Sequence, residues 1–217
     1  MPILPYCMTE PAFSLDSPLT GVSGAAVEAV EAGGVRCFFS LVADENSSTR
    51  PQDAALSFHR VLQEIFARTA ILPFRFPTIL EGEPELISHI QEHAAEYRSA
   101  LARLRDLVQM EIRISSDGLK QSKKKEEEKA SGTEYLLNRL AERRKLESAA
   151  ENVRNDAASL LRGWRQRESG AGLRCFMLLR RGEIAQLRSA LSRVQISPDL
   201  AVRVSGPWPA TEFVKEA

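Results

Sequence analysis

The sequence predicts an α+β fold of two small domains, each a ferredoxin-like sheet with helices on one face. The main observation is an internal sequence similarity: residues 34–41 (GVRCFFSL) and 172–179 (GLRCFMLL) are nearly identical. Each is a short apolar run introduced by glycine, which is typical of a buried strand. An amphipathic helix and a second strand follow in both halves, at 51–68 and 71–76, then at 183–194 and 200–204. Strand, helix and strand therefore occur twice, and the pattern alone leaves a true repeat undecided.

The predicted N-terminal domain covers residues 1–105. Gly33 and Gly34 separate two of its strands and indicate a hairpin. Pro51 and Pro84 suit the first turn of a helix, where the missing amide hydrogen costs nothing. The remaining elements expected in this domain are strands near 3–8 and 26–31 and a helix over 85–104.

The predicted C-terminal domain covers residues 106–217, with a three-stranded sheet formed by 107–114, 172–179 and 200–205. Residues 115–133 contain a lysine and glutamate run with almost no apolar side chains, which predicts a mobile, solvated loop. We expect the last strand to stop at Ser205, because Pro207 and Pro209 cannot donate to a sheet ladder. Trp208 between them is then either a buried core residue or an exposed residue that anchors a partner.

One long helix is predicted over 133–167. Part of it has the alternating four-and-three spacing of a coiled-coil seam: Leu146, Ala150, Val153, Ala157, Leu160 and Trp164. Upstream the same register meets Arg143 and Arg139, so the seam is only partial. Either the helix packs across both domains, or part of it forms an interface with a partner helix.

Composition excludes several functions. Lys and Arg total 29 and Asp and Glu total 29, and a balanced charge argues against a dedicated nucleic-acid binder. No apolar run has the length of a membrane span, and the start does not resemble a signal peptide. Cys7, Cys37 and Cys175 lie far apart in apolar contexts, which predicts reduced, buried thiols in a cytoplasmic protein.

One string has the form of a catalytic motif. His89, Glu92 and His93 match the H-x-x-E-H pattern, in which two histidines bind zinc and the glutamate acts as base. A zinc-dependent hydrolase is therefore the alternative function, although nothing in the sequence marks a third ligand. Phosphate-binding and dinucleotide-binding loops are absent from the sequence, so we expect no cofactor.

Three segments together resemble a known family. They are residues 71–78 (ILPFRFPT), following a helix with FHRVL; residues 135–139 (YLLNR); and residues 206–209 (GPWP), followed by Phe213. In this order and spacing they resemble the GvpL/GvpF family of gas-vesicle accessory proteins. Pro77 departs from the glycine that is usual in this family at that position.

The resemblance implies a non-enzymatic accessory or minor structural protein of gas vesicles. Its expected partners are the hydrophobic shell protein GvpA, whose aggregation it would limit during nucleation and assembly, and other gas vesicle accessory proteins. The expected location is the cytoplasm and the gas vesicle, with no nucleic-acid or membrane partner. Candidate partner-binding residues are Arg75, Trp208 and Phe213.

Overall fold

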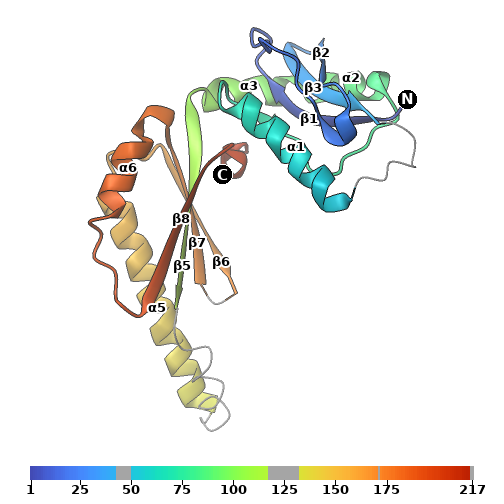
Figure 1. Cartoon of the computed structure of the whole chain (residues 1–217). Coiled ribbons are helices and arrows are strands. Elements are labelled where there is room, and N and C mark those ends of the chain that lie inside the picture. The colour runs from blue at the N-terminus through green and yellow to red at the C-terminus, as the bar shows by residue number, and fades with distance from the viewer. Residues whose placement is uncertain (43–49, 117–131, 171, 216–217) are drawn as a thin grey trace. The chain divides into compact units, whose positions relative to one another are not determined.

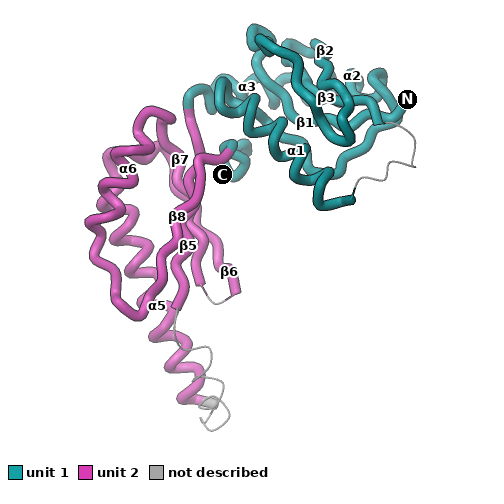
Figure 2. The backbone as a smooth tube through the Cα atoms, in the orientation of Figure 1, with its two compact units in different colours: residues 1–106, 209–217 teal, residues 107–208 magenta. Residues whose placement is uncertain are grey.

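The computed structural model describes residues 1–42, 50–116, 132–170 and 172–215 (Figure 1). The chain forms two compact units (Figure 2): unit 1 contains Met1–Asp106 and Pro209–Ala217, and unit 2 contains Leu107–Trp208. The assignment of the tail to the C-terminal domain was therefore wrong. The tail belongs to unit 1 because Phe213 is buried in the core of that unit.

Unit 1 contains an antiparallel four-stranded sheet in the order β2-β3-β1-β4. Its strands are β1 (Ile3–Thr9), β2 (Glu28–Ala32), β3 (Val35–Leu41) and β4 (Leu72–Pro73). All seven residues of β1 are buried, so both faces of this strand are covered. The predicted hairpin is confirmed. Gly33 (φ 56°) and Gly34 (φ 78°) form its two-residue turn, and both positive φ values favour glycine.

The described part of unit 1 also contains three α-helices: α1 (Pro51–Phe66), α2 (Glu83–Glu92) and α3 (Ala94–Leu104). The single helix predicted over 85–104 is two helices, because the backbone leaves helical geometry at His93 (φ −110°, ψ 11°). The strand predicted over 71–76 is also shorter than expected. Only Leu72 and Pro73 pair with β1, at Met8 and Cys7.

Unit 2 contains an antiparallel sheet in the order β6-β7-β5-β8. Its strands are β5 (Leu107–Ser116), β6 (Gly163–Ser169), β7 (Gly172–Arg180) and β8 (Leu200–Trp208). The helices α5 (Gly132–Asp156) and α6 (Ile184–Leu191) lie on one side of it (Figure 1). The element order β-α-β-β-α-β is the ferredoxin-like arrangement. The sheet has four strands where three were predicted.

The predicted helix over 133–167 was wrong at its C-terminal end. α5 ends at Asp156, and Trp164 lies in β6, paired with Met177 of β7. The seam residues Leu146, Ala150 and Val153 are buried where α5 contacts β5, β7 and α6. They cover the sheet of their own unit, so a coiled coil is not confirmed.

The predicted mobile loop at 115–133 falls largely outside the described residues. Its first two residues, Ser115 and Ser116, belong to β5, and Thr133 belongs to α5. Residues 117–131 lie outside the described part of the chain.

The predicted end of the last strand at Ser205 was wrong. β8 continues to Trp208, which pairs with Gln109, while Ser205 pairs with Glu111. Three steps along β8 thus match two along β5, which is a β-bulge at Gly206 and Pro207. The bulge accommodates a proline that cannot donate to the ladder.

The two similar sequence segments occupy equivalent positions in the two units. Residues 34–41 and 172–179 are β3 and β7, and each lies between the first and second strands of its own unit. A helix and then the outer strand follow in both units, α1 and β4 or α6 and β8. Between its first two strands unit 1 has only the short helix η1 (Val22–Gly24), where unit 2 has α5.

All three cysteines are buried free thiols, as predicted. Burial raises the pKa of the Cys7 and Cys37 thiols well above the ordinary value, and that of Cys175 to about 11. All three therefore remain protonated near neutral pH, and the thiolate is the reactive form. In the described part of the chain, no helix combines the length and apolar character needed to cross a membrane.

Candidate functional site

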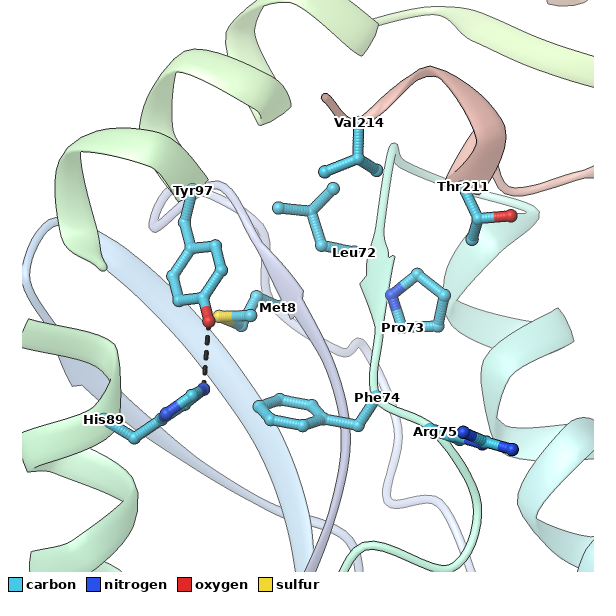
Figure 3. Close-up of a pocket in the computed structure, with 9 residues that line it drawn as sticks. All are labelled: Met8, Leu72, Pro73, Phe74, Arg75, His89, Tyr97, Thr211 and Val214. Atoms are coloured by element: carbon cyan, nitrogen blue, oxygen red, sulfur yellow. Dashed lines mark hydrogen bonds between the residues drawn. The ribbon is translucent and has the colours of Figure 1, made fainter. Parts of the chain in front are cut away.

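The candidate site is a pocket of about 340 Å³ within unit 1 (Figure 3). Four parts of the chain contribute to it: β1, the segment that contains β4, the helices α2 and α3, and the C-terminal tail. The lining residues are Met8, Leu72, Pro73, Phe74, Arg75, His89, Tyr97, Thr211 and Val214. Most of these side chains are apolar, so the pocket suits an apolar group with a few polar contacts.

The tail forms its wall through contacts with α3. Arg103 donates hydrogen bonds to the carbonyl oxygens of Phe213 (2.8 Å) and Val214 (2.7 Å). Phe213 ends the short helix η3 (Thr211–Phe213) and is only 5% exposed. The buried ring and the two hydrogen bonds hold Thr211 and Val214 at the pocket.

The polar side of the pocket is a tyrosine–histidine pair. The hydroxyl of Tyr97 lies 2.9 Å from His89 Nε2 and shares a hydrogen bond with it (Figure 3). Burial raises the pKa of Tyr97, and the negative charge of Glu96 raises it further. The phenol therefore stays protonated near neutral pH.

The two histidines, His89 and His93, are half-buried. The ring centroids of His89 and His93 lie 4.9 Å apart, and Phe74 lies 6.1 Å from His89. Tyr97 completes the cluster, at 6.1 Å from His89 and 5.8 Å from His93. These rings pack against each other on the α2–α3 side of the pocket.

The arrangement does not resemble a zinc site. His93 lies where α2 ends, and its Nδ1 is 3.0 Å from the carbonyl oxygen of His89. Glu92 is exposed, and Nε2 of His89 is already engaged in a hydrogen bond with the Tyr97 hydroxyl. Among the described residues, no group of three or more His, Cys, Asp or Glu side chains is placed to hold a metal ion.

The three predicted partner-binding residues have different surroundings in their own units. Arg75 is exposed at the pocket that it helps to line, and in Figure 3 its guanidinium points away from the His89–Tyr97 pair. Phe213 is a core residue of unit 1, and its neighbours Thr211 and Val214 line the pocket instead. Trp208 belongs to unit 2, where it is half-buried and its Nε1 donates to Ser205 Oγ at 3.4 Å.

Comparison with known families identifies the relatives of this chain. A family described as gas vesicle synthesis protein GvpL/GvpF matches residues 3–215. The chain belongs to the GvpL/GvpF family. Its role is therefore connected with gas vesicles, as the resemblance in the sequence implied.

Solved structures support the same fold. The gas vesicle protein GvpF from Anabaena sp. PCC7120 superposes with a TM-score of 0.81 at 14% identity, over 100% of this chain and 97% of that chain. GvpF from Microcystis aeruginosa gives a TM-score of 0.77 at 15% identity, over 99% of both chains. None of the curated proteins compared matches the sequence.

Proposed function

We propose that this GvpL/GvpF-family member is a non-catalytic accessory or minor structural protein that binds the hydrophobic shell protein GvpA. In this role it limits the aggregation of shell subunits in the cytoplasm and assists nucleation and assembly of the gas vesicle. Other gas vesicle accessory proteins are its further partners. Family membership supports the connection with gas vesicles, and the observation that carries the binding role is the position of β8 at the edge of its sheet.

β8 has the features of a strand that accepts another strand. It is nine residues long, lies at the edge of its sheet, and contains Arg203 as its one charged residue. Val204 is 41% exposed. A long apolar edge offers unpaired backbone groups, and an unassembled shell subunit with apolar strand edges would pair with it.

The other sheet edges are better protected. β2 carries Glu28 and Glu31, β6 carries Arg165, Arg167 and Glu168, and charged side chains oppose pairing with another chain. β4 is only two residues long and includes Pro73, which has no amide hydrogen to donate. Strand pairing with an apolar partner is therefore favoured at residues 200–205 of β8, which precede the bulge and Pro207.

α5 adds an apolar surface in the same unit. Leu136 and Leu137 are both 61% exposed and Leu140 is 53% exposed, before the buried part of the helix begins at Leu146. Three exposed leucines within five residues form a patch suited to a hydrophobic partner. This surface supports the interpretation of part of the helix as a partner interface.

The binding test mixes purified protein with shell subunit and follows light scattering at low and high salt. We expect suppression at both salt concentrations, because screening weakens exposed charge pairs and leaves apolar burial intact. Val204→Lys places a charge on the free edge and should weaken suppression roughly tenfold, a loss of about 1.4 kcal/mol. Gln166→Lys, an exposed position on the edge strand β6, is the matched control. If the protein neither suppresses aggregation nor co-purifies with the shell subunit at either salt concentration, the proposed role is excluded.

The non-catalytic part of the proposal has its own test. The double variant His89→Ala/His93→Ala should retain shell binding, because both histidines belong to unit 1 whereas β8 belongs to unit 2. Stoichiometric zinc in the native protein, lost in this variant together with hydrolytic activity, would instead establish the zinc-dependent hydrolase that uses His89, Glu92 and His93.

A further inference from the structure

Four arginines form a row across the sheet of unit 2. Arg113 on β5 pairs directly with Arg203 on β8 and with Arg174 on β7, and Arg174 pairs in turn with Arg167 on β6. Directly opposed residues of antiparallel strands project from the same face of a sheet. The four side chains, which we call the arginine row, therefore share one face.

That face is the one without helices. Ile112 and Ile114, which alternate with Arg113 along β5, are completely buried on the face that contacts α5. The Arg113 side chain is 61% exposed and that of Arg174 is 36% exposed. Arg167 and Arg203, at the two ends of the row, are also exposed.

Among the described residues of the four strands, the charged side chains on this face are almost all arginines. Arg165 stands two residues from Arg167 and therefore on the same face, and Glu111 is the one carboxylate that the described residues of the four strands place there. Like charges directly opposite one another destabilise a sheet. A sheet face that carries four directly opposed arginines despite this repulsion is suited to binding an anionic partner.

The neighbouring rung carries only small side chains. Next to the arginine row, the residues paired across the four strands are all small: Ser169, Gly172, Ser115 and Ala201. A partner chain can therefore approach the backbone closely beside the guanidinium groups. On the other side of the row stand Phe176 and Glu111, which are both buried.

We infer that the arginine row binds an extended acidic segment of a partner protein. Three strand spacings of about 4.8 Å make the row about 14 Å long. Carboxylates at alternate positions of an extended chain lie about 6.8 Å apart, so three of them span the same length. Arginine suits this role because its planar fork matches a carboxylate with two hydrogen bonds.

Other occupants fit less well. Single-stranded nucleic acid needs exposed aromatic rings for base stacking, and Phe176, the aromatic residue in the middle of this face, is 2% exposed with Arg174 above it at 5.1 Å. A second copy of this chain would bring two positive rows together. The inference does not rest on the proposed function, because it concerns a different chemistry and a different face.

The test titrates the full chain into labelled synthetic peptides and follows fluorescence anisotropy. The probes are a peptide of alternating glutamate and serine, the same peptide with lysine for glutamate, and a single-stranded oligonucleotide. We expect the glutamate peptide to bind at least roughly tenfold more tightly than the other two probes, and to dissociate as salt is added. Tighter binding of the lysine peptide or the oligonucleotide would overturn the inference.

Variants at the ends of the row test the location. Arg203→Gln should weaken binding of the glutamate peptide roughly fivefold, and adding Arg167→Gln should weaken it further, because each substitution removes one charged donor. Arg154→Gln removes the same charge from an exposed position on α5, outside the arginine row, and is the matched control. Urea unfolding of each variant checks that the fold is retained. Equal binding by Arg203→Gln and Arg154→Gln would place the peptide elsewhere and exclude the arginine row.

Discussion

Glu111 on β5 accepts two hydrogen bonds from Arg174 on β7, Oε1 from Nε at 2.8 Å and Oε2 from Nη2 at 3.1 Å. Arg113, two residues along β5, donates Nε to the same Oε1 at 2.6 Å. Arg113 and Arg174 pair directly across the strands, and like charges in that position repel. The buried carboxylate thus offsets the repulsion between Arg113 and Arg174 at the centre of the arginine row.

Glu111→Gln should lower the free energy of unfolding by about 2 kcal/mol at neutral pH, because it removes charge-assisted hydrogen bonds to two arginines. Urea unfolding at pH 7 measures the change. Glu147→Gln, which affects an exposed pair with Arg143, is the control and should change stability by less than about 0.5 kcal/mol. An equal effect of the two substitutions would contradict a special role for Glu111.

The same carboxylate predicts a pH dependence. Hydrogen bonding from Arg174 holds the pKa of Glu111 below its ordinary value, against the opposing effect of burial. A group with a lowered folded pKa stabilises the fold above its unfolded pKa, about 4.3, and loses that contribution as pH falls through the folded pKa. The stability difference between wild type and Glu111→Gln should therefore shrink below about pH 4. A difference that stays constant through this range would show that the shift is absent.

Arg103→Ala should loosen the tail while unit 1 remains folded. It removes both donors to the carbonyls of Phe213 and Val214, at a cost of about 1–3 kcal/mol. Hydrogen exchange at the Phe213 amide should accelerate, since its local bond to Ala210 depends on the tail staying docked. Arg98→Ala, an exposed arginine on the same helix, is the control and should leave this exchange rate unchanged.

Gly206→Ala should destabilise unit 2 by more than about 2 kcal/mol. Gly206 has a φ of 114°, and an added Cβ would lie 2.9 Å from Met110 Sδ and 3.0 Å from the carbonyl oxygen of Gln109. Thermal or urea unfolding measures the loss. Gly182→Ala is the matched control, because its Cβ would meet nothing within 4 Å and its φ is not positive. Similar midpoints for the two variants would mean that the bulge tolerates a side chain.

Trp208→Ala should lower the free energy of unfolding by about 2 kcal/mol, less than the 3–5 kcal/mol typical of a fully buried tryptophan. The side chain is half-buried and makes a hydrogen bond to Ser205. Urea unfolding and shell binding measured together separate a packing role from an anchor. Unchanged stability with lost binding would identify Trp208 as an anchor.

The sequence predicted the elements whose signal is local. The apolar runs at 34–41 and 172–179 became β3 and β7, and the paired glycines before the first run became a hairpin turn. β6 could not be recognised in this way, because Gly163–Ser169 contains one apolar side chain, Trp164, and continues an apparent helical spacing. Its strand geometry comes from pairing with β7, a long-range contact that no local pattern encodes.

The candidate site was less predictable than the fold. The His89–Tyr97 hydrogen bond joins two helices that were predicted as one, and Val214 reaches the pocket from the far end of the chain. Phe213 illustrates the difference clearly. The family resemblance made it a candidate for a partner contact, whereas folding buries the ring and leaves its neighbours Thr211 and Val214 lining the pocket. The arginine row likewise depends on the register of four strands.

Unit 2 interrupts unit 1, because the chain leaves it after Asp106 and returns at Pro209. The pairing of Gln109 with Trp208 places the exit and the return on adjacent strands, about 5 Å apart. Unit 2 is thus an insertion with closely spaced ends, and a few glycine and serine residues could replace it without stretching the host. Conversely, a single proteolytic cut in either of the two connections between the units leaves the units covalently joined through the second connection.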